Sequence, residues 1–203
     1  MTKVTRISDF KFGLPVADDW ARWPVGEGNE AVADDLAVRY ADGPDAQALV
    51  RRSVIAMNAD ALGKPGTILE EAIWIPDRST GEGMAVLDTL LWGFPKGADP
   101  SAKAFVARRN LKSDMGRGSK VFDYDVGLTD VPAGGAVTEA YTIRLRREKI
   151  IRGYLLFSIF PEGAHDAACL QVTTAHLGLM KELGEQMRII AQSGELTLWD
   201  APE

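Results

Sequence analysis

The residues best suited to chemistry are His165, Cys169 and His176, the only histidines and the only cysteine of the chain. A cysteine nucleophile needs a thiolate that a nearby imidazole or positive charge activates. Cys169 lies in an apolar run of strand type, where cysteine behaves as a small buried hydrophobe. A metal site from His165, Asp166 and His176 would span eleven residues with a strand between, which matches no standard spacing. We therefore predict no catalytic residue, no metal site and no cofactor.

Two pairs of carboxylates have the residue type for general acid–base work. Glu70 and Glu71 are adjacent, so a strand would point them to opposite faces and keep them apart. Asp123 and Asp125 would share one face, with Tyr124 on the other. Acid–base catalysis would need these two to be desolvated so that their pKa values separate, whereas a half-exposed strand has a solvated polar face, which we favour.

A glycine-containing basic stretch and a pair of tryptophans could also form binding sites. GRGSK at 116–120 has too few residues between its glycines for a phosphate-binding loop and precedes a strand, so a flexible loop is favoured. Trp20 and Trp23 lie in a Pro-containing stretch, where they fit either the core or the rim of a pocket. Core burial is the interpretation that we favour for the two tryptophans. The alternative is a pocket, for which Trp20, Trp23, Asp123 and Asp125 are the candidate lining residues.

The rest of the chain must supply the elements that carry these residues. Residues 10–20 indicate a short strand and a turn at Pro15, followed by a loop that holds both tryptophans. Residues 29–40 fit a helix or a helical turn followed by a strand. Apolar periodicity and end signals predict helices over 42–63, 99–112 and 174–193. Strands are predicted over 67–77, 84–94, 120–128, 136–146, 149–160, 168–173 and 195–199.

This order of elements predicts the fold class. Consecutive strands with short connections require antiparallel pairing, because parallel neighbours need long crossovers. We expect a single α+β domain over residues 1–203, with a central antiparallel sheet of about six to seven strands and helices packed on it as a layered sandwich.

The two ends of the chain carry a family resemblance. FKFGLPVADDW at 10–20 and the final strand–helix–strand from Leu170 to Trp199 resemble the first strand and last elements of PsbP-like domains. That superfamily includes an extrinsic photosystem protein, a Ran-binding import factor and small actinobacterial proteins of unassigned role. The resemblance implies an antiparallel sheet between helices and a role in binding or assembly without catalysis, with no catalytic residues to carry over.

Charge is distributed unevenly along the sequence. The chain has a net charge of −6, which argues against broad nucleic-acid binding, yet residues 101–152 carry 11 basic and 6 acidic side chains. Five of the nine side chains from Arg144 to Arg152 are basic. We interpret this stretch as the tip of a hairpin with Arg147, Glu148 and Lys149 at its turn. The hairpin alone does not require the charges of Arg144 and Arg152.

The resulting hypothesis is a non-enzymatic cytoplasmic module that contacts an acidic protein partner through the basic segment 103–152. Its contacts would be Arg108, Arg109, Lys112, Arg144, Arg146 and Arg152, with Arg147 and Lys149 beside them. The alternatives are a small-ligand-binding protein or enzyme with a pocket between sheet and helices, and assembly into a homo-oligomer. The polar N-terminus, the single cysteine and the absence of a long apolar run favour the cytoplasm over a membrane or envelope location.

Overall fold

The computed structural model describes residues 3–13, 19–63, 67–95, 97–111, 118–145 and 149–202. The strands are β1 Lys3–Lys11, β2 Trp20–Pro24, β3 Thr67–Trp74, β4 Ala85–Gly93, β5 Lys120–Val131, β6 Gly134–Arg144, β7 Arg152–Phe160, β8 Asp166–Thr174 and β9 Glu195–Pro202. The helices are α1 Glu30–Tyr40, α2 Pro44–Gly63, α3 Ala102–Arg108, the 3-10 turn η1 Leu177–Leu179 and α5 Met180–Gln192.

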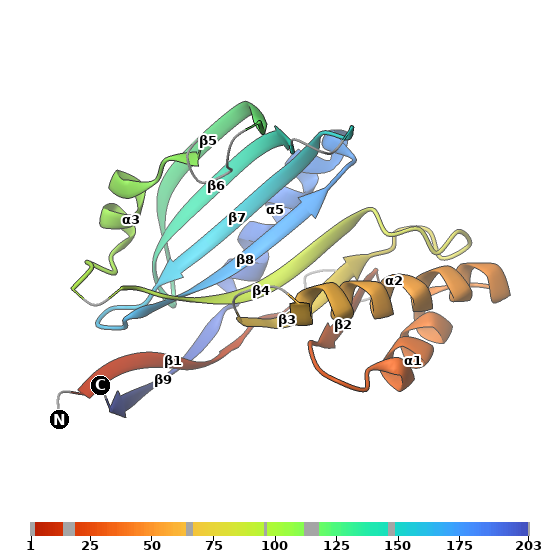
Figure 1. The fold of residues 1–203 in the computed structure, drawn as a ribbon, viewed down its shortest axis with the longest axis horizontal. Coiled ribbons are helices and arrows are strands. Elements are labelled where there is room, and N and C mark those ends of the chain that lie inside the picture. Colours follow the sequence, from red (N-terminus) through yellow and green to blue (C-terminus); the bar gives the residue numbers. More distant parts are fainter. Residues whose placement is uncertain are drawn as a thin grey trace.

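Seven strands form one antiparallel sheet in the order β2-β3-β4-β8-β7-β6-β5, and β1 pairs with β9 in a separate ribbon (Figure 1). The predicted α+β architecture with a central antiparallel sheet is confirmed. Short connections join β3 to β4 and link β5, β6, β7 and β8 in series, which is why these neighbours run antiparallel. No helix in the described part of the chain is long and apolar enough to span a membrane.

The N-terminal third differs from the sequence prediction. The stretch with Trp20 and Trp23 is not a loop but the edge strand β2, which pairs with β3 and places Trp20 opposite Trp74. These two indoles stack with centroids 6.3 Å apart, and both Trp20 and Trp23 are almost completely buried. Residues 29–40, left open between two interpretations, form helix α1.

The helix predicted over 99–112 is shorter, since α3 ends at Arg108.

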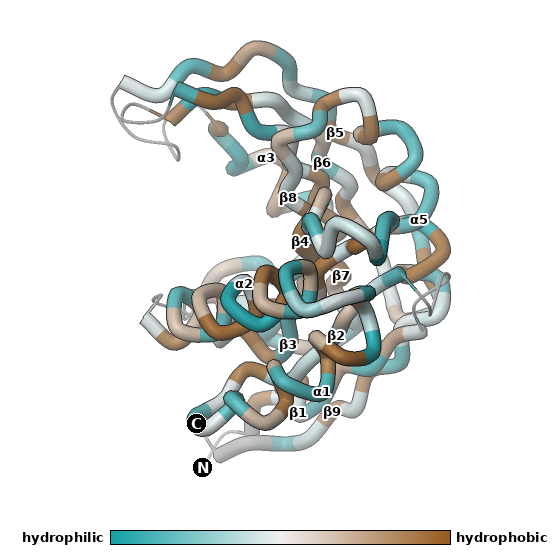
Figure 2. The backbone as a smooth tube through the Cα atoms, turned by 90° about the vertical axis from the view of Figure 1, so that its right-hand side faces the viewer, coloured by the Kyte–Doolittle hydropathy of each residue, from teal (hydrophilic) through white to brown (hydrophobic). Residues whose placement is uncertain are grey.

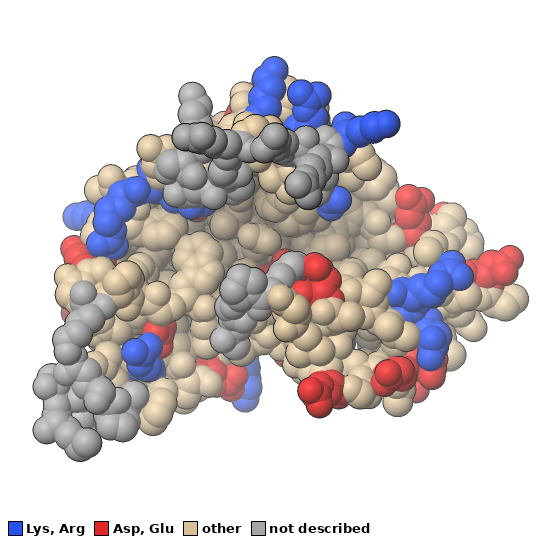
Figure 3. Space-filling model, viewed as in Figure 1, with Lys and Arg blue, Asp and Glu red and all other residues tan. Residues whose placement is uncertain are grey.

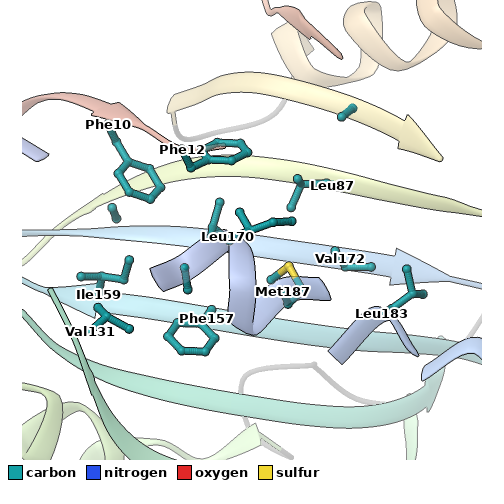
Figure 4. Packing of buried hydrophobic residues seen from close by; sticks show 14 of the residues in the cluster. Phe10, Phe12, Leu87, Val131, Phe157, Ile159, Leu170, Val172, Leu183 and Met187 are labelled. Carbon is teal, nitrogen blue, oxygen red and sulfur yellow. The ribbon is translucent and has the colours of Figure 1, made fainter. Parts of the chain in front are cut away.

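The two faces of the sheet are covered differently. Helix α5 packs over β7 and β8 on one face, where Leu183, Met187 and Ile190 join the largest core cluster (Figure 4). On the opposite face, α1 and α2 cover the end near β2 and β3, and α3 lies over β5, β6 and β7. Figure 2 shows α2 and α3 on one side of the curved sheet and α5 on the other. The edge strand β5 is therefore left largely exposed on the face of α5.

Candidate functional site

The predicted basic contacts do not form one surface. Arg144 ends β6 opposite Lys120 of β5, whereas Arg152 begins β7 opposite Ile143. Since side chains alternate along a strand, Arg144 and Arg152 point to opposite faces of the sheet. Basic side chains still gather at this end of the molecule (Figure 3). The predicted contacts Lys112, Arg146 and Arg147 lie outside the residues that the structure describes.

The other two predicted contacts, Arg108 and Arg109, lie at the end of α3 and have different surroundings. Arg108 is exposed and donates a hydrogen bond to the carbonyl oxygen of Asp99, 2.7 Å away. Arg109 points toward the sheet, where its Nε donates to Oε1 of Glu139 at 2.7 Å. The Glu139 side chain is fully buried, with 0% exposure, and that of Arg109 is 15% exposed. Arg109 thus joins α3 to β6 through a buried ion pair.

Two tyrosines extend this buried polar group across neighbouring strands. The Tyr124 hydroxyl donates to Oε1 of Glu139 at 2.9 Å, and burial together with this carboxylate raises the pKa of Tyr124 to about 12. Tyr141 lies directly between Tyr124 and Tyr154 and stacks on Tyr154 with centroids 5.1 Å apart. Burial also raises the pKa of Tyr141. At neutral pH these phenols keep their protons, and that of Tyr124 donates a hydrogen bond to Glu139.

Cys169 is buried in β8, as its strand pattern predicts. Its sulfur lies 3.6 Å from the Ser158 hydroxyl and 3.6 Å from the Leu170 carbonyl oxygen, and neither group is a base. Burial raises the pKa of the thiol to about 12, which opposes formation of a nucleophilic thiolate. In the described ranges, no three metal-ligating side chains are grouped so that they could hold an ion.

The candidate pocket residues divide between the two edges of the sheet. Trp20 and Trp23 belong to β2, and Asp123 and Asp125 belong to β5, the strand at the opposite edge. The indole Nε1 of Trp20 donates to Gln186 of α5 at 3.0 Å, so this tryptophan attaches the helix to the sheet. These four residues therefore do not line one common pocket.

Asp123 and Asp125 instead line a groove between β5 and α5. Its larger cavity has a volume of about 760 Å³ and is lined by Phe122, Asp123, Tyr124, Asp125, Ala140, Tyr141, Thr142, Ile151, Leu177 and Met180. A second cavity of about 350 Å³ shares Asp125, Ala140 and Met180 with the first, and so continues it along the helix. We call the two cavities together the α5–β5 groove.

The groove arises from where α5 packs and from small side chains on the strands beneath it. Gly153 of β7 lets the start of α5 approach closely, since a Cβ built on Gly153 would lie 2.2 Å from the Met180 sulfur. Helix α5 contacts β7 and β8, so Ala140 of β6 remains only partly covered. A bulge in β5 between Val121 and Asp123 precedes the two aspartates. The result is an apolar floor open along one side.

Leu177 and Met180 are the groove residues that the sequence did not distinguish from core. The apolar stripe of the last helix includes them, but its later members Leu183, Met187 and Ile190 are buried, while Leu177 is 39% exposed. Phe122, on the opposite wall, is 40% exposed. Large apolar side chains face each other across the groove and offer a surface for an apolar ligand, with carboxylates at its side.

Comparisons with known proteins bear on the fold alone. No family model matches the sequence, and no curated protein matches it. LpqN, described as involved in cell envelope biogenesis of Mycobacterium tuberculosis, is 13% identical with a TM-score of 0.51, covering 97% of this chain and 90% of LpqN. Cyanobacterial PsbP (CyanoP) from Synechocystis sp. PCC 6803 is 9% identical with a TM-score of 0.48, covering 94% of each chain. LpqN therefore shares the fold of this chain, and no residue role carries over.

Proposed function

We propose that this protein is a non-enzymatic binding module whose α5–β5 groove holds an elongated, mainly apolar ligand. The observation that carries the proposal is the continuity of two cavities, of about 760 and 350 Å³, along one wall of α5. Ligand pockets commonly have volumes of roughly 300–1,000 Å³, with mostly apolar walls and a few polar groups that set orientation. The larger cavity has this size and this composition.

The exposure of its apolar walls supports the proposal. Phe122 and Leu177 are 40% and 39% exposed, and Ile151 and Met180 are partly exposed beside them. Burying such side chains against a ligand is favourable by roughly 25 cal/mol per Å² of apolar area removed from water. A ligand that lies along the groove would therefore gain binding energy that the protein alone leaves unused.

A fluorescent probe and one groove-filling substitution test the proposal. The neutral dye 6-propionyl-2-(dimethylamino)naphthalene, prodan, should bind with a rise in fluorescence. Gly184→Leu adds a side chain to the helix wall of the smaller cavity, and a Cβ at Gly184 meets nothing within 4 Å, so the fold should tolerate it. Replacing a helical glycine also favours the helix by up to about 1 kcal/mol.

Gly184→Leu should weaken prodan binding by about tenfold or more. Gly178→Leu is the matched control, because a Cβ at Gly178 also meets nothing within 4 Å and this residue does not line the groove. Equal binding by both variants, or no binding by the unaltered protein, would refute the assignment. Thermal unfolding of each variant reports whether the fold is retained.

A second candidate function is contact with an acidic protein partner at the end of the sheet that carries Lys120, Arg144, Lys149 and Arg152. It is favoured by the basic side chains that gather at one end of the molecule (Figure 3), where Lys120 begins β5, Arg144 ends β6, Arg152 begins β7 and Lys149 lies between β6 and β7. Charge reversal at Arg144 and Lys149 should abolish a salt-sensitive interaction in pull-down experiments, with Lys103→Glu on α3 as the control. A partner set that is unchanged by the double reversal would exclude this function.

The site of action is also a proposal. The sequence favours the cytoplasm, whereas LpqN, which shares the fold, is described as involved in cell envelope biogenesis. We keep the cytoplasm as the expected location. Fractionation of cells that produce the full-length chain would test it, and recovery in the envelope fraction would overturn it.

A further inference from the structure

The larger cavity of the groove carries charge of one sign. Asp123 and Asp125 are its charged lining residues in the described chain, and no described lysine or arginine lines it. The carboxylate of Asp123 accepts a hydrogen bond from the Thr142 hydroxyl at 3.0 Å. Neither aspartate forms an ion pair with a described residue. Two negative charges thus lie beside an apolar floor with no ion-pair partner among the described residues.

An aromatic ring at the same wall already holds a cation. The Lys120 ammonium lies 4.7 Å from the centroid of the Phe122 ring, and Phe122 lines the cavity next to Asp123. A cation is attracted to the face of an aromatic ring at distances up to about 6 Å. Because Lys120 of the chain itself occupies this ring, the preference for positive over negative charge in the cavity comes from the carboxylates of Asp123 and Asp125.

The smaller cavity does not reverse this preference. Its lining has two basic residues, Lys181 and Arg188, and three acidic ones, Asp125, Glu139 and Glu185; Glu139 is paired with Arg109, so the remaining charges balance. The larger cavity, of about 760 Å³, is therefore the part of the groove whose lining carries a net negative charge. A ligand with a charged head and an apolar tail would place its head at Asp123 and Asp125 and extend its tail past Met180.

From this charge pattern we infer that the groove selects cationic amphiphiles, meaning ligands with an alkylammonium-type head and an apolar chain. The inference rests on the proposed ligand-binding function and adds the charge of the ligand to it. The carboxylates are exposed, so solvent screening limits each to a gain of at most about fivefold in affinity. The apolar walls supply the rest of the binding, and the aspartates determine which head group is preferred.

Three ligands with the same ten-carbon chain test the inference: decylamine, decanol and decanoate, each used to displace prodan at pH 7 and low ionic strength. Decylamine is then a cation, because alkylamines hold their proton as lysine does. We expect it to displace prodan at a concentration about five- to tenfold lower than decanol, with decanoate weakest. The preference for the amine over the alcohol should shrink at high salt, because exposed charges are screened.

Asp123→Asn combined with Asp125→Asn should bring decylamine to the affinity of decanol and leave decanol unchanged. Asp130→Asn is the matched control, since Asp130 is an exposed aspartate of the same strand outside the groove. If decanol and decylamine bind equally, or decanoate binds best, the inference is overturned while the proposed function stands. If none of the three displaces bound prodan, or prodan itself does not bind, both are overturned.

Discussion

Removing the guanidinium of Arg109 is the most decisive perturbation of this structure. Arg109→Met keeps an unbranched apolar stem but leaves the fully buried carboxylate of Glu139 without the charge that lies 2.7 Å from it. Breaking a buried ion pair from one side typically costs about 3–5 kcal/mol, because an uncompensated charge stays in a poorly solvated site. For a chain of 203 residues, such a loss corresponds to a fall in Tm of roughly 6–20 °C.

The partner substitution should cost less. Glu139→Gln still offers an oxygen to the Tyr124 hydroxyl, and Arg109 is 15% exposed, so its charge reaches water. We expect a loss of about 1.5–3 kcal/mol, the range of a single hydrogen bond to a charged group. The double variant should be more stable than the sum of the single losses predicts, by about 2 kcal/mol, because it leaves no buried charge.

Urea unfolding followed by circular dichroism measures these free energies, provided that the slope with denaturant stays constant. Arg108→Met is the matched control, since this neighbouring arginine is exposed and hydrogen-bonds a backbone carbonyl, and its loss should lie within about 0.5 kcal/mol. The reasoning is refuted if Arg109→Met costs less than about 1 kcal/mol, if the two arginines cost the same, or if the double variant is simply additive.

Three further outcomes are expected. Gly153→Ala places a Cβ 2.2 Å from the Met180 sulfur and should lower the free energy of unfolding by about 1–3 kcal/mol in urea titrations, whereas Gly178→Ala, which meets open space, should not. Folding raises the pKa of Tyr141, so the unfolded chain loses this phenolic proton at a lower pH than the folded chain does. The Tm should therefore stay constant up to about pH 10 and fall at higher pH. Tyr141→Phe should make that fall in Tm smaller. Asp166→Asn removes a carboxylate that bonds an arginine of β1 at 2.8 Å, and should speed hydrogen exchange in β1 and β9 by about fivefold while α2 stays unchanged.

The sequence predicted the elements whose signals are local. The helix from Pro44 to Gly63 and the apolar stripe of the last helix follow from side chains three and four residues apart. The hairpin between β6 and β7 follows from alternation on both sides of a charged turn. Glu70 and Glu71 face opposite ways, because that is a property of any strand: Glu70 forms an ion pair with Arg22, while Glu71 is buried.

The elements that were missed or left open lack such signals. Five residues with a terminal proline, WARWP, read as a loop, and they form β2 because β3 offers an edge on which Trp20 meets Trp74. Helix α1 buries two alanines along with Leu36 and Tyr40, so its apolar stripe is weak in the sequence. For β2 the decisive contact is made with a strand far along the chain, whereas α1 packs mainly on α2, the next helix.

The candidate site shows the same division. The clustering of basic residues predicted the same role for Arg108 and Arg109. In the structure, the position of α3 over β6 buries Arg109 against Glu139 and leaves Arg108 exposed. Alternation placed Asp123 and Asp125 on one face, but no local pattern could tell that α5 would cover β7 and β8 and stop short of β5.

By itself, the sequence determined the antiparallel α+β architecture, the burial of Cys169 and the shared face of Asp123 and Asp125, because periodicity and short connections act between near neighbours. Only the tertiary structure decided that the two tryptophans of β2 belong to the core, that Arg109 forms a buried ion pair with Glu139, and that Leu177 and Met180 line a groove. These outcomes depend on which strands a helix covers, and that choice is made by packing between segments widely separated in the chain.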